Sequence, residues 1–204
     1  MNKKDEGEIE MQRAMLNRLS THMPTLETER LLLRRIEKSD ADDMYEYSCD
    51  RDVTKYLLWD AHPDPFYTAD YVEYLQERYA LGDFYDWAIV LKENGKMIGT
   101  CGFTNFDLPN GACEIGYVLN PLYRGKGIAP EAAGCVIKYA FEVLGLERVS
   151  AICMKENAAS LRVMAKCGMT YEGTLRRAVF CKGRHIDVSV CSVIREEYEK
   201  GLAH

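Results

Sequence analysis

Long apolar runs are missing from this sequence. No stretch reaches the roughly 18 apolar residues that a membrane-spanning helix needs, and the charged first two dozen residues lack the apolar centre of a secretion signal. There are no repeats, no low-complexity segments and no linker long enough to separate two domains. A chain of 204 residues that is 47% hydrophobic and 28% charged is typical of one globular domain. We expect one such domain, with at most a short extension, that does not use a membrane as partner.

Paired cysteines are missing as well. No Cys-x-x-Cys occurs, and none of the four histidines has the spacing of metal ligands on a helix. The pattern predicts free thiols in a reducing cytoplasm, no disulfide framework and no metal site. The eight cysteines stand singly, at Cys49, Cys101, Cys113, Cys135, Cys153, Cys167, Cys181 and Cys191.

Basic residues are scarce in one part of the chain. The net charge is −6, but residues 37–86 hold fourteen acidic and only four basic residues. A nucleic-acid-binding surface needs the opposite sign, so we do not expect nucleic acid as a partner. The acidic segment suits either a cationic partner or a solvated surface that keeps the protein in solution.

An amphipathic helix is predicted ahead of the domain. Met11, Met15, Leu19 and Met23 recur at a spacing of four, before a proline at position 24. We interpret residues 1–24 as a helical extension and residues 25–204 as the domain. Such a helix packs either on the body or on a second copy of the chain, so a homodimer is possible.

The domain reads as an α/β (α+β) fold. Asn94-Gly95 between two apolar runs predicts a hairpin. A strand, a glycine loop, a helix and a strand follow one another over residues 113–153, which requires one parallel βαβ crossover in a mixed, mostly antiparallel sheet. Strands are expected over residues 30–36, 87–92, 97–103, 113–119, 148–153, 174–181 and 186–194. One helix is expected after Ser39 or Asp40 as its cap. Others are expected from Thr68 and over residues 128–144 and 158–166.

The loop between the strand over residues 113–119 and the next helix holds two glycines and two cations. It reads LNPLYRGKGIAPEAAG, residues 119–134. At Gly125 and Gly127 the backbone can approach a ligand closely, and the N–H groups of a helix start attract anions. Arg124 and Lys126 add full positive charges. The loop alone indicates an anion site, although many strand-to-helix turns contain glycine.

The pattern Arg124-x-x-Gly127-x-Ala129, placed between a strand and a helix, resembles the signature of the GNAT superfamily of acetyl-CoA-dependent N-acetyltransferases. The stretches TERLLLRRIEKSDADDM, NGKMIGTCGF and ENAASLRVMAKCGMTYEGTLRR resemble other parts of that family, so the likeness covers about residues 25–198 in the right order. The branch that looks nearest is the Rim type, which acetylates the N-termini of ribosomal proteins. Neither a P-loop nor a second βαβ unit is present.

The resemblance implies acetyl-CoA as co-substrate. Its pantetheine arm would enter between two splayed central strands and pair with the backbone of the first, and its pyrophosphate would lie on the glycine loop. Asn157 matches a family asparagine that contacts the coenzyme, and it also suits a helix cap. The coenzyme-binding residues so implied are Val118, Leu119, Asn120, Arg124, Gly125, Lys126, Gly127, Ile128, Ala129 and Asn157.

Two residues are candidates for the chemistry. Glu114 matches a catalytic glutamate of some GNAT enzymes. It also fits an exposed strand carboxylate without a catalytic role, and the base is dispensable if water relays the proton. The usual family tyrosine acid is replaced by Met164, and the Rim-type serine is kept as Ser160, which is our candidate proton donor to the coenzyme sulfur. Ser160 could instead only bond to backbone at a helix start. A glutamate that assists this serine in some Rim-type enzymes looks like Val179 here.

The acceptor is a primary amine in this interpretation. The acidic span 37–86 should wall its cleft, together with aromatic residues that suit a cation or belong to the core. A peptide or protein N-terminal amine is the first choice, and a small cationic amine such as a polyamine or aminosugar is the second. A non-catalytic acyl-CoA sensor is the alternative from another class. The aromatic residues are Tyr56, Trp59, Tyr67, Tyr71 and Phe84.

Overall fold

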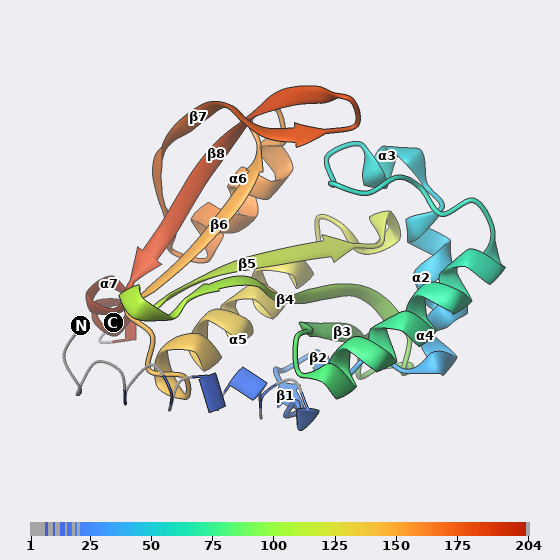
Figure 1. Ribbon diagram of the computed structural model, residues 1–204, viewed down its shortest axis with the longest axis horizontal. Coiled ribbons are helices and arrows are strands. Elements are labelled where there is room, and N and C mark those ends of the chain that lie inside the picture. Colours follow the sequence, from blue (N-terminus) through green and yellow to red (C-terminus); the bar gives the residue numbers. More distant parts are fainter. Residues whose placement is uncertain are drawn as a thin grey trace.

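The computed structural model describes residues 7, 10, 13, 14, 16, 17, 19 and 21–202. One mixed sheet of eight strands forms its centre, in the order β1-β2-β3-β4-β5-β6-β8-β7 (Figure 1). The strands are β1 Leu26–Glu27, β2 Leu31–Arg34, β3 Tyr85–Leu91, β4 Met97–Asp107, β5 Ala112–Leu119, β6 Arg148–Met154, β7 Thr170–Cys181 and β8 Arg184–Ile194. The helices are α2 Ala41–Ser48, α3 Arg51–Thr54, α4 Pro65–Leu81, α5 Ile128–Glu142, α6 Ala158–Lys166 and α7 Arg195–Leu202.

The sheet opens in its middle. β5 and β6 are the parallel pair, and they pair only where Ala112–Glu114 lies beside Arg148–Ser150. β6 then continues along β8, while β5 continues along β4, so the two halves of the sheet diverge (Figure 1). A bulge in β4, between Phe103 and Asn105, adds to the local bend. One edge of β5 is therefore left without a neighbouring strand beyond Glu114.

The two faces of the sheet are covered differently. α5 packs on one face, where Trp87 meets Tyr139 ring to ring at 5.8 Å between centroids. α2 and α4 lie on the opposite face, at the right of Figure 1. Side chains alternate between these faces along each strand. The row that crosses β3, β4 and β5 on the α2–α4 face is Asp86, Gly102 and Gly116, and the row on the α5 face is Trp87, Cys101 and Tyr117.

The described residues from 7 to 21 are helical. Leu16, Leu19 and Met23 are buried in the main core, so this helix packs on the body of the domain. The indole nitrogen of Trp87 donates to the carbonyl of Pro24 at 2.8 Å and fixes the chain where the helix has ended. Met11 and Met15 lie outside the described residues, and a separate extension over residues 1–24 stays a prediction.

The predicted fold class, the hairpin and the βαβ unit are confirmed. One helix start differs from the prediction. α4 begins at Pro65 rather than Thr68, because the Asp64 side chain caps it through the Tyr67 N–H at 2.8 Å and proline suits the first turn. Asp40 stands at the N-cap position of α2, as predicted, but its side chain makes no capping bond, because Arg34 and the Glu37 N–H occupy that carboxylate.

Candidate active site

A cavity of about 430 Å³ lies at the opening between β5 and α6. The glycine loop, the end of β5, one side of α6 and part of α3 form its walls. Nine of the twelve residues predicted for the site line it: Val118, Leu119, Arg124, Gly125, Gly127, Ile128, Ala129, Asn157 and Ser160. Glu114, Asn120 and Lys126 do not.

The glycine loop has the backbone that the sequence suggests. Gly125 and Gly127 have φ angles of +77° and +78°, a region that other residues rarely adopt, and a Cβ built on Gly125 meets no atom within 4 Å. Arg30 donates to the carbonyl of Lys126 at 2.9 Å and pairs with Glu131 of α5. Because Arg30 binds the Lys126 carbonyl, this oxygen is occupied, and the loop can present its N–H groups to an anion at the start of α5.

Asn120 and Lys126 have other contacts. Asn120 is buried, accepts from the Leu122 N–H at 3.1 Å and donates to Glu46 at 3.3 Å. The Lys126 ammonium lies 5.3 Å from the ring centre of Tyr123. Asn120 therefore shapes the turn after β5, whereas Lys126 stays exposed near the cavity. Their predicted contacts with the coenzyme stay predictions.

Two hydroxyl groups meet inside this cavity. The Tyr117 hydroxyl lies 2.8 Å from the Ser160 hydroxyl and also donates to the Ser160 carbonyl at 3.1 Å. Asn157 accepts from the Ser160 N–H at 3.1 Å and so caps α6. Burial raises the pKa of Tyr117, which keeps its proton on the oxygen at neutral pH. Met164 is buried in the core and lines neither cavity described here.

Sequence reasoning missed Tyr117. It follows Gly116 in the strand already assigned to the coenzyme, and its side chain lies on the α5 face, where α6 comes close. The sequence shows only that a tyrosine stands beside the residues predicted to pair with the coenzyme. Its contact with Ser160 could not be predicted, because that contact depends on how α6 packs against β5.

A second cavity, of about 500 Å³, lies on the α2–α4 face. Thr100 and Val118 of the sheet form part of its floor, and Val118 also lines the first cavity. The two cavities therefore meet at Val118, where the sheet opens. Four of the five aromatic residues predicted for the acceptor cleft line this cavity, namely Trp59, Tyr67, Tyr71 and Phe84, while Tyr56 lines the first one.

Asp86 is a second residue that sequence reasoning missed as a site. It lies on β3 and lines the second cavity beside the aromatic wall. Burial raises the pKa of its carboxyl to about 7. A Cβ built on Gly102, directly across on β4, would meet Asp86 Oδ1, so glycine is needed there to leave room for the carboxylate.

His62 is a buried polar residue in the wall of the same cavity. Its Nδ1 is 3.0 Å from the Ser48 hydroxyl and 2.8 Å from the Thr68 hydroxyl. Its ring packs against those of Trp59, Tyr67 and Tyr71. Burial lowers the pKa of His62, so the ring is neutral at pH 7.

Glu114 lines neither cavity. Its carboxylate accepts a hydrogen bond from the Thr104 hydroxyl at 2.8 Å, next to the β4 bulge. It lies on the same face of β5 as Val118 but four residues earlier, where β5 still pairs with β6. Its role as base stays a prediction.

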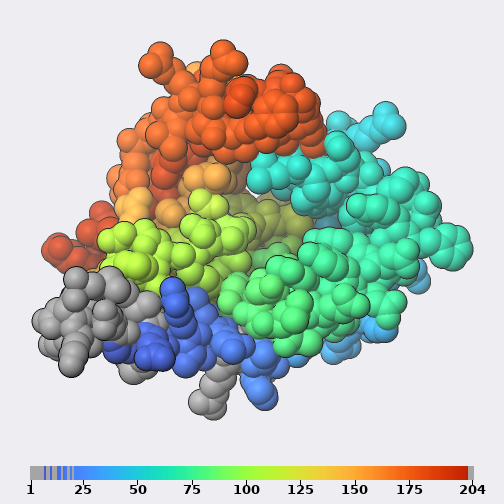
Figure 2. Space-filling model, in the orientation of Figure 1, coloured from blue at the N-terminus to red at the C-terminus, as the bar shows by residue number. Residues whose placement is uncertain are grey.

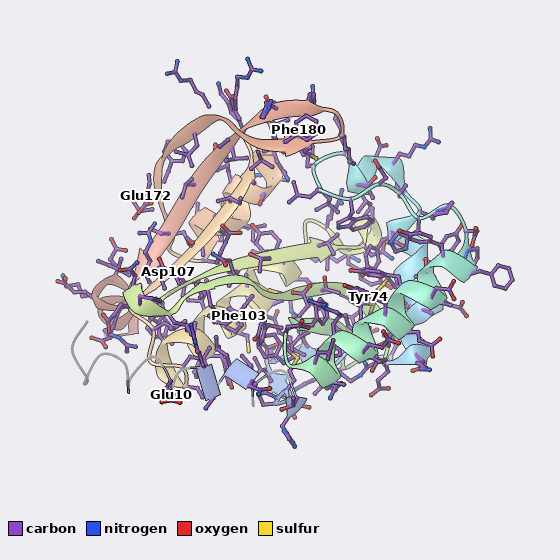
Figure 3. The ribbon with its side chains drawn as sticks, viewed as in Figure 1. Glu10, Tyr74, Phe103, Asp107, Glu172 and Phe180 are labelled. Atoms are coloured by element: carbon purple, nitrogen blue, oxygen red, sulfur yellow. The ribbon has the colours of Figure 1, made fainter. Side chains whose placement is uncertain are left out.

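The β7–β8 hairpin reaches across the opening between β5 and β6 and contacts the segment around α3. The Lys182 ammonium donates to the Thr54 carbonyl at 2.7 Å and lies 3.5 Å from Asp60, while the Cys181 thiol approaches the Leu57 carbonyl at 3.7 Å. Figures 1 and 2 show the hairpin meeting the segment around α3, and in Figure 3 Phe180 lies at this end of the hairpin and Glu172 toward the other. Val179 and Tyr56 both pack against a small buried cluster that includes Cys181. The hairpin and α3 together roof the site.

The described part of the chain holds no group of three or more metal-binding side chains, and none of its helices is long and apolar enough to cross a membrane. All eight cysteines are free thiols. Burial raises the pKa of several of them, Cys113 to about 12 and Cys167 to about 11, which makes those two poor nucleophiles.

Comparison with known proteins identifies the family. The model of the acetyltransferase (GNAT) domain matches residues 30–170. The chain belongs to the GNAT acetyltransferases. It is 39% identical over 176 residues to the uncharacterized N-acetyltransferase p20 of Bacillus licheniformis, covering 86% of this chain and 99% of that protein. A GNAT-family acetyltransferase structure from Bacillus anthracis superposes with a TM-score of 0.76 at 30% identity, covering 85% of this chain and 99% of that one.

Two further matches are named for different acceptors. Spermidine N(1)-acetyltransferase of Escherichia coli K12 is 26% identical, with 81% of this chain and 87% of that protein covered. The structure of ribosomal-protein-S5-alanine acetyltransferase from Vibrio fischeri has a TM-score of 0.71 at 26% identity, with 85% and 97% covered. These GNAT relatives establish an N-acetyltransferase with acetyl-CoA as co-substrate, and they leave its acceptor open.

Proposed function

We propose that this GNAT enzyme acetylates the N-terminal amine of a peptide or protein. The observation that carries the proposal is the second cavity, which joins the first at Val118 and combines an aromatic wall with a carboxylate. Such a cavity suits one cationic amine with a small neighbouring group. The other carboxylate that lines it, Asp60, is exposed and lies 3.5 Å from Lys182.

A small cationic amine is the second candidate. The acidic span of residues 37–86 favours it, because exposed carboxylates around the cavity attract positive charge. A polyamine, however, carries several ammonium groups on a flexible chain. The described lining of the cavity supplies one carboxylate without an ion-pair partner, which suits one ammonium group better than several.

The first cavity has the features that acetyl-CoA requires. The free edge of β5 after Glu114 can pair with the amide groups of the pantetheine arm, and nothing blocks approach to Gly125. The N–H groups from Gly125 to Ala129 and the Arg124 guanidinium would hold the pyrophosphate. Bound there, acetyl-CoA supplies the activated acetyl group for transfer.

Direct transfer to the amine fits the side chains present. The Tyr117–Ser160 hydroxyl pair lies in the coenzyme cavity, so we assign it the delivery of a proton to the sulfur that leaves. The Cys113 thiol is buried and the Cys167 thiol largely so, each with a raised pKa, which disfavours an acyl-enzyme on either.

The experiment is acetyl-CoA-dependent thiol release with products identified by mass spectrometry. The acceptors are peptides that begin with Ala, Ser or Met, together with spermidine, an aminoglycoside and free amino acids. We expect one acetyl group on a peptide N-terminus and slower reaction with the others. Preferred acetylation of spermidine or the aminoglycoside would replace the first proposal with the second.

The proposal also covers the location of the protein in the cell and its oligomeric state. Eight free thiols suit a reducing cytoplasm, and we propose that location. We also keep the proposal of a homodimer, although the buried face of the N-terminal helix already packs on its own domain. Light scattering of the purified chain tests the second point directly.

A further inference from the structure

Asp86 is the less exposed of the two carboxylates that line the acceptor cavity. It is half-buried on β3, and in the described part of the chain neither a cation nor a hydrogen-bond donor occupies its carboxylate. Desolvation by burial is the one cause that raises its pKa. Asp60 differs, because it is exposed at the rim near Lys182.

Gly102 on β4 leaves room for the Asp86 carboxylate on the side of Asp86 that faces β5. Gly102 is the partner of Asp86 on β4, and Gly116 is the partner of Gly102 on β5. The Asp86 carboxylate lies over Gly102, and the methyl group of Thr104 lies over Gly116. Neighbouring strands are about 4.8 Å apart, so this carboxylate lies roughly one strand spacing from β5. An amine placed between Asp86 and Val118 is therefore within reach of both, directly or through one water.

Among the described residues that line this cavity with Asp86, none is positively charged at neutral pH. The Tyr79 hydroxyl donates to the Asp86 backbone carbonyl at 2.5 Å and so holds the backbone of β3 against α4. Burial raises the pKa of Tyr71 to about 12 and lowers that of His62, so both are neutral at pH 7. The titratable groups that face Asp86 or share its cavity are Tyr47 of α2, Tyr67, Tyr71 and Tyr79 of α4, and Asp60 and His62 of the segment between α3 and α4. Cys101 of β4 lies on the opposite face of the sheet, near enough for Asp86 to help raise its pKa.

We propose that Asp86 binds the ammonium group of the acceptor and removes its proton. The inference rests on the acetyltransferase activity and on the second cavity as its acceptor site, but not on which amine is the natural acceptor. A carboxylate without a cation beside it attracts an ammonium ion, and its own desolvation makes it basic enough to accept a proton near neutral pH. Glu114 is less suited, because it lies outside the cavity.

The step balances without another reactant. One ammonium proton passes to the Asp86 carboxylate, which leaves a neutral amine with a free electron pair. That pair forms the C–N bond with the thioester carbon, and the C–S bond breaks with its electrons on sulfur. The second amine proton reaches the sulfur, through the Tyr117–Ser160 pair in our assignment, and the third stays on the amide. Asp86 then returns its proton to water.

The test is the pH dependence of kcat/KM for the amine, measured for the wild type, Asp86→Asn and Asp86→Glu. For the wild type we expect activity to fall below an apparent pKa near 7. In Asp86→Asn we expect a loss on the order of 100-fold or more at pH 7, an unchanged KM for acetyl-CoA, and activity that rises only toward the pKa of the free amine. Asp86→Glu should keep the fall near neutral pH at a lower rate.

Asp83→Asn is the matched control, because it makes the same chemical change three residues earlier, on an exposed side chain that pairs with Arg78 outside both cavities. It should behave as the wild type. An Asp86→Asn enzyme with the wild-type pH profile would overturn the inference, as would loss of the acidic limb in Glu114→Gln alone. Any amine that the enzyme acetylates serves in this test, so a wrong acceptor and a wrong base give different results. Asp86→Glu gives the answer even if Asp86→Asn does not fold.

Discussion

At Gly127 the backbone has a φ of +78°, and the same residue starts α5 and lines the coenzyme cavity. We expect Gly127→Glu to abolish measurable acetyl-CoA binding, because the side chain strains the backbone and places a negative charge where the pyrophosphate would lie. Isothermal titration calorimetry measures this. Gly145→Glu is the control, since Gly145 also has a positive φ, +67°, but lies beyond the other end of α5. Unchanged affinity in Gly127→Glu would contradict the assignment of the loop.

The Tyr117–Ser160 pair gives a prediction about turnover. Ser160→Ala and Tyr117→Phe each remove one hydroxyl from the 2.8 Å contact in the coenzyme cavity. We expect kcat to fall about 10-fold or more in each, with little change in the affinity for acetyl-CoA, because the pair acts on the leaving sulfur. The double variant should lose little beyond the single ones if the two hydroxyls act as a unit. Full activity in both single variants would remove the pair from the mechanism.

Asp86 also makes a prediction about stability. Its folded pKa, about 7, is above the ordinary value near 4 of an unfolded aspartate, so the folded state loses stability as pH rises from about 4 to about 7. Asp86→Asn removes the cost of holding a desolvated charge. We therefore expect the variant to be more stable than the wild type by about 1 to 3 kcal/mol at pH 8, with the difference shrinking toward pH 5. Urea unfolding at both pH values measures it, and a variant less stable at pH 8 would show that the carboxylate has a stabilising partner.

At the scale of single elements, the sequence predicted best those turns and helix ends that depend on the conformation of one or two residues. Asn94-Gly95 marks a hairpin, and Gly145 and Gly168 end helices because glycine adopts positive φ without strain. The glycine loop was recognisable for the same reason. Asp86 was not recognisable as a site, because its position depends on its register with Gly102 and on the packing of α2 and α4 over β3. Such long-range pairing leaves no local pattern in the chain.

The β7–β8 hairpin contributes to the site as an element. Lys182 has a φ of +49°, and it donates to the Thr54 carbonyl across the opening. Lys182→Asn keeps a residue that tolerates positive φ but is too short to reach Thr54. We expect faster amide hydrogen exchange in residues 54–60 and a KM for the amine that rises a few-fold, because the roof over both cavities loosens. Arg184→Asn in the same hairpin is the control, and identical exchange in both variants would show that the contact does not close the roof.

At the scale of the whole molecule, the opening of the sheet determines where the reaction takes place. β5 leaves β6 after Glu114, the coenzyme cavity lies on the α5–α6 side, and the acceptor cavity lies on the α2–α4 side. Val118 belongs to both. The acidic residues of the chain gather in residues 37–86, which supply most of the acceptor side, so the two sides also differ in charge. A cationic amine and an anionic coenzyme are thereby directed to opposite sides of one opening.

The most direct test is a crystal structure of the enzyme with a bisubstrate analogue, in which coenzyme A is joined through an acetyl linker to the amine of a short peptide. The account predicts that the pyrophosphate lies on the N–H groups of Gly125 to Ala129 and that the linker passes Val118. The peptide nitrogen should lie within hydrogen-bonding reach of Asp86, directly or through one water. A peptide that leaves the opening without entering the aromatic cavity would contradict the account.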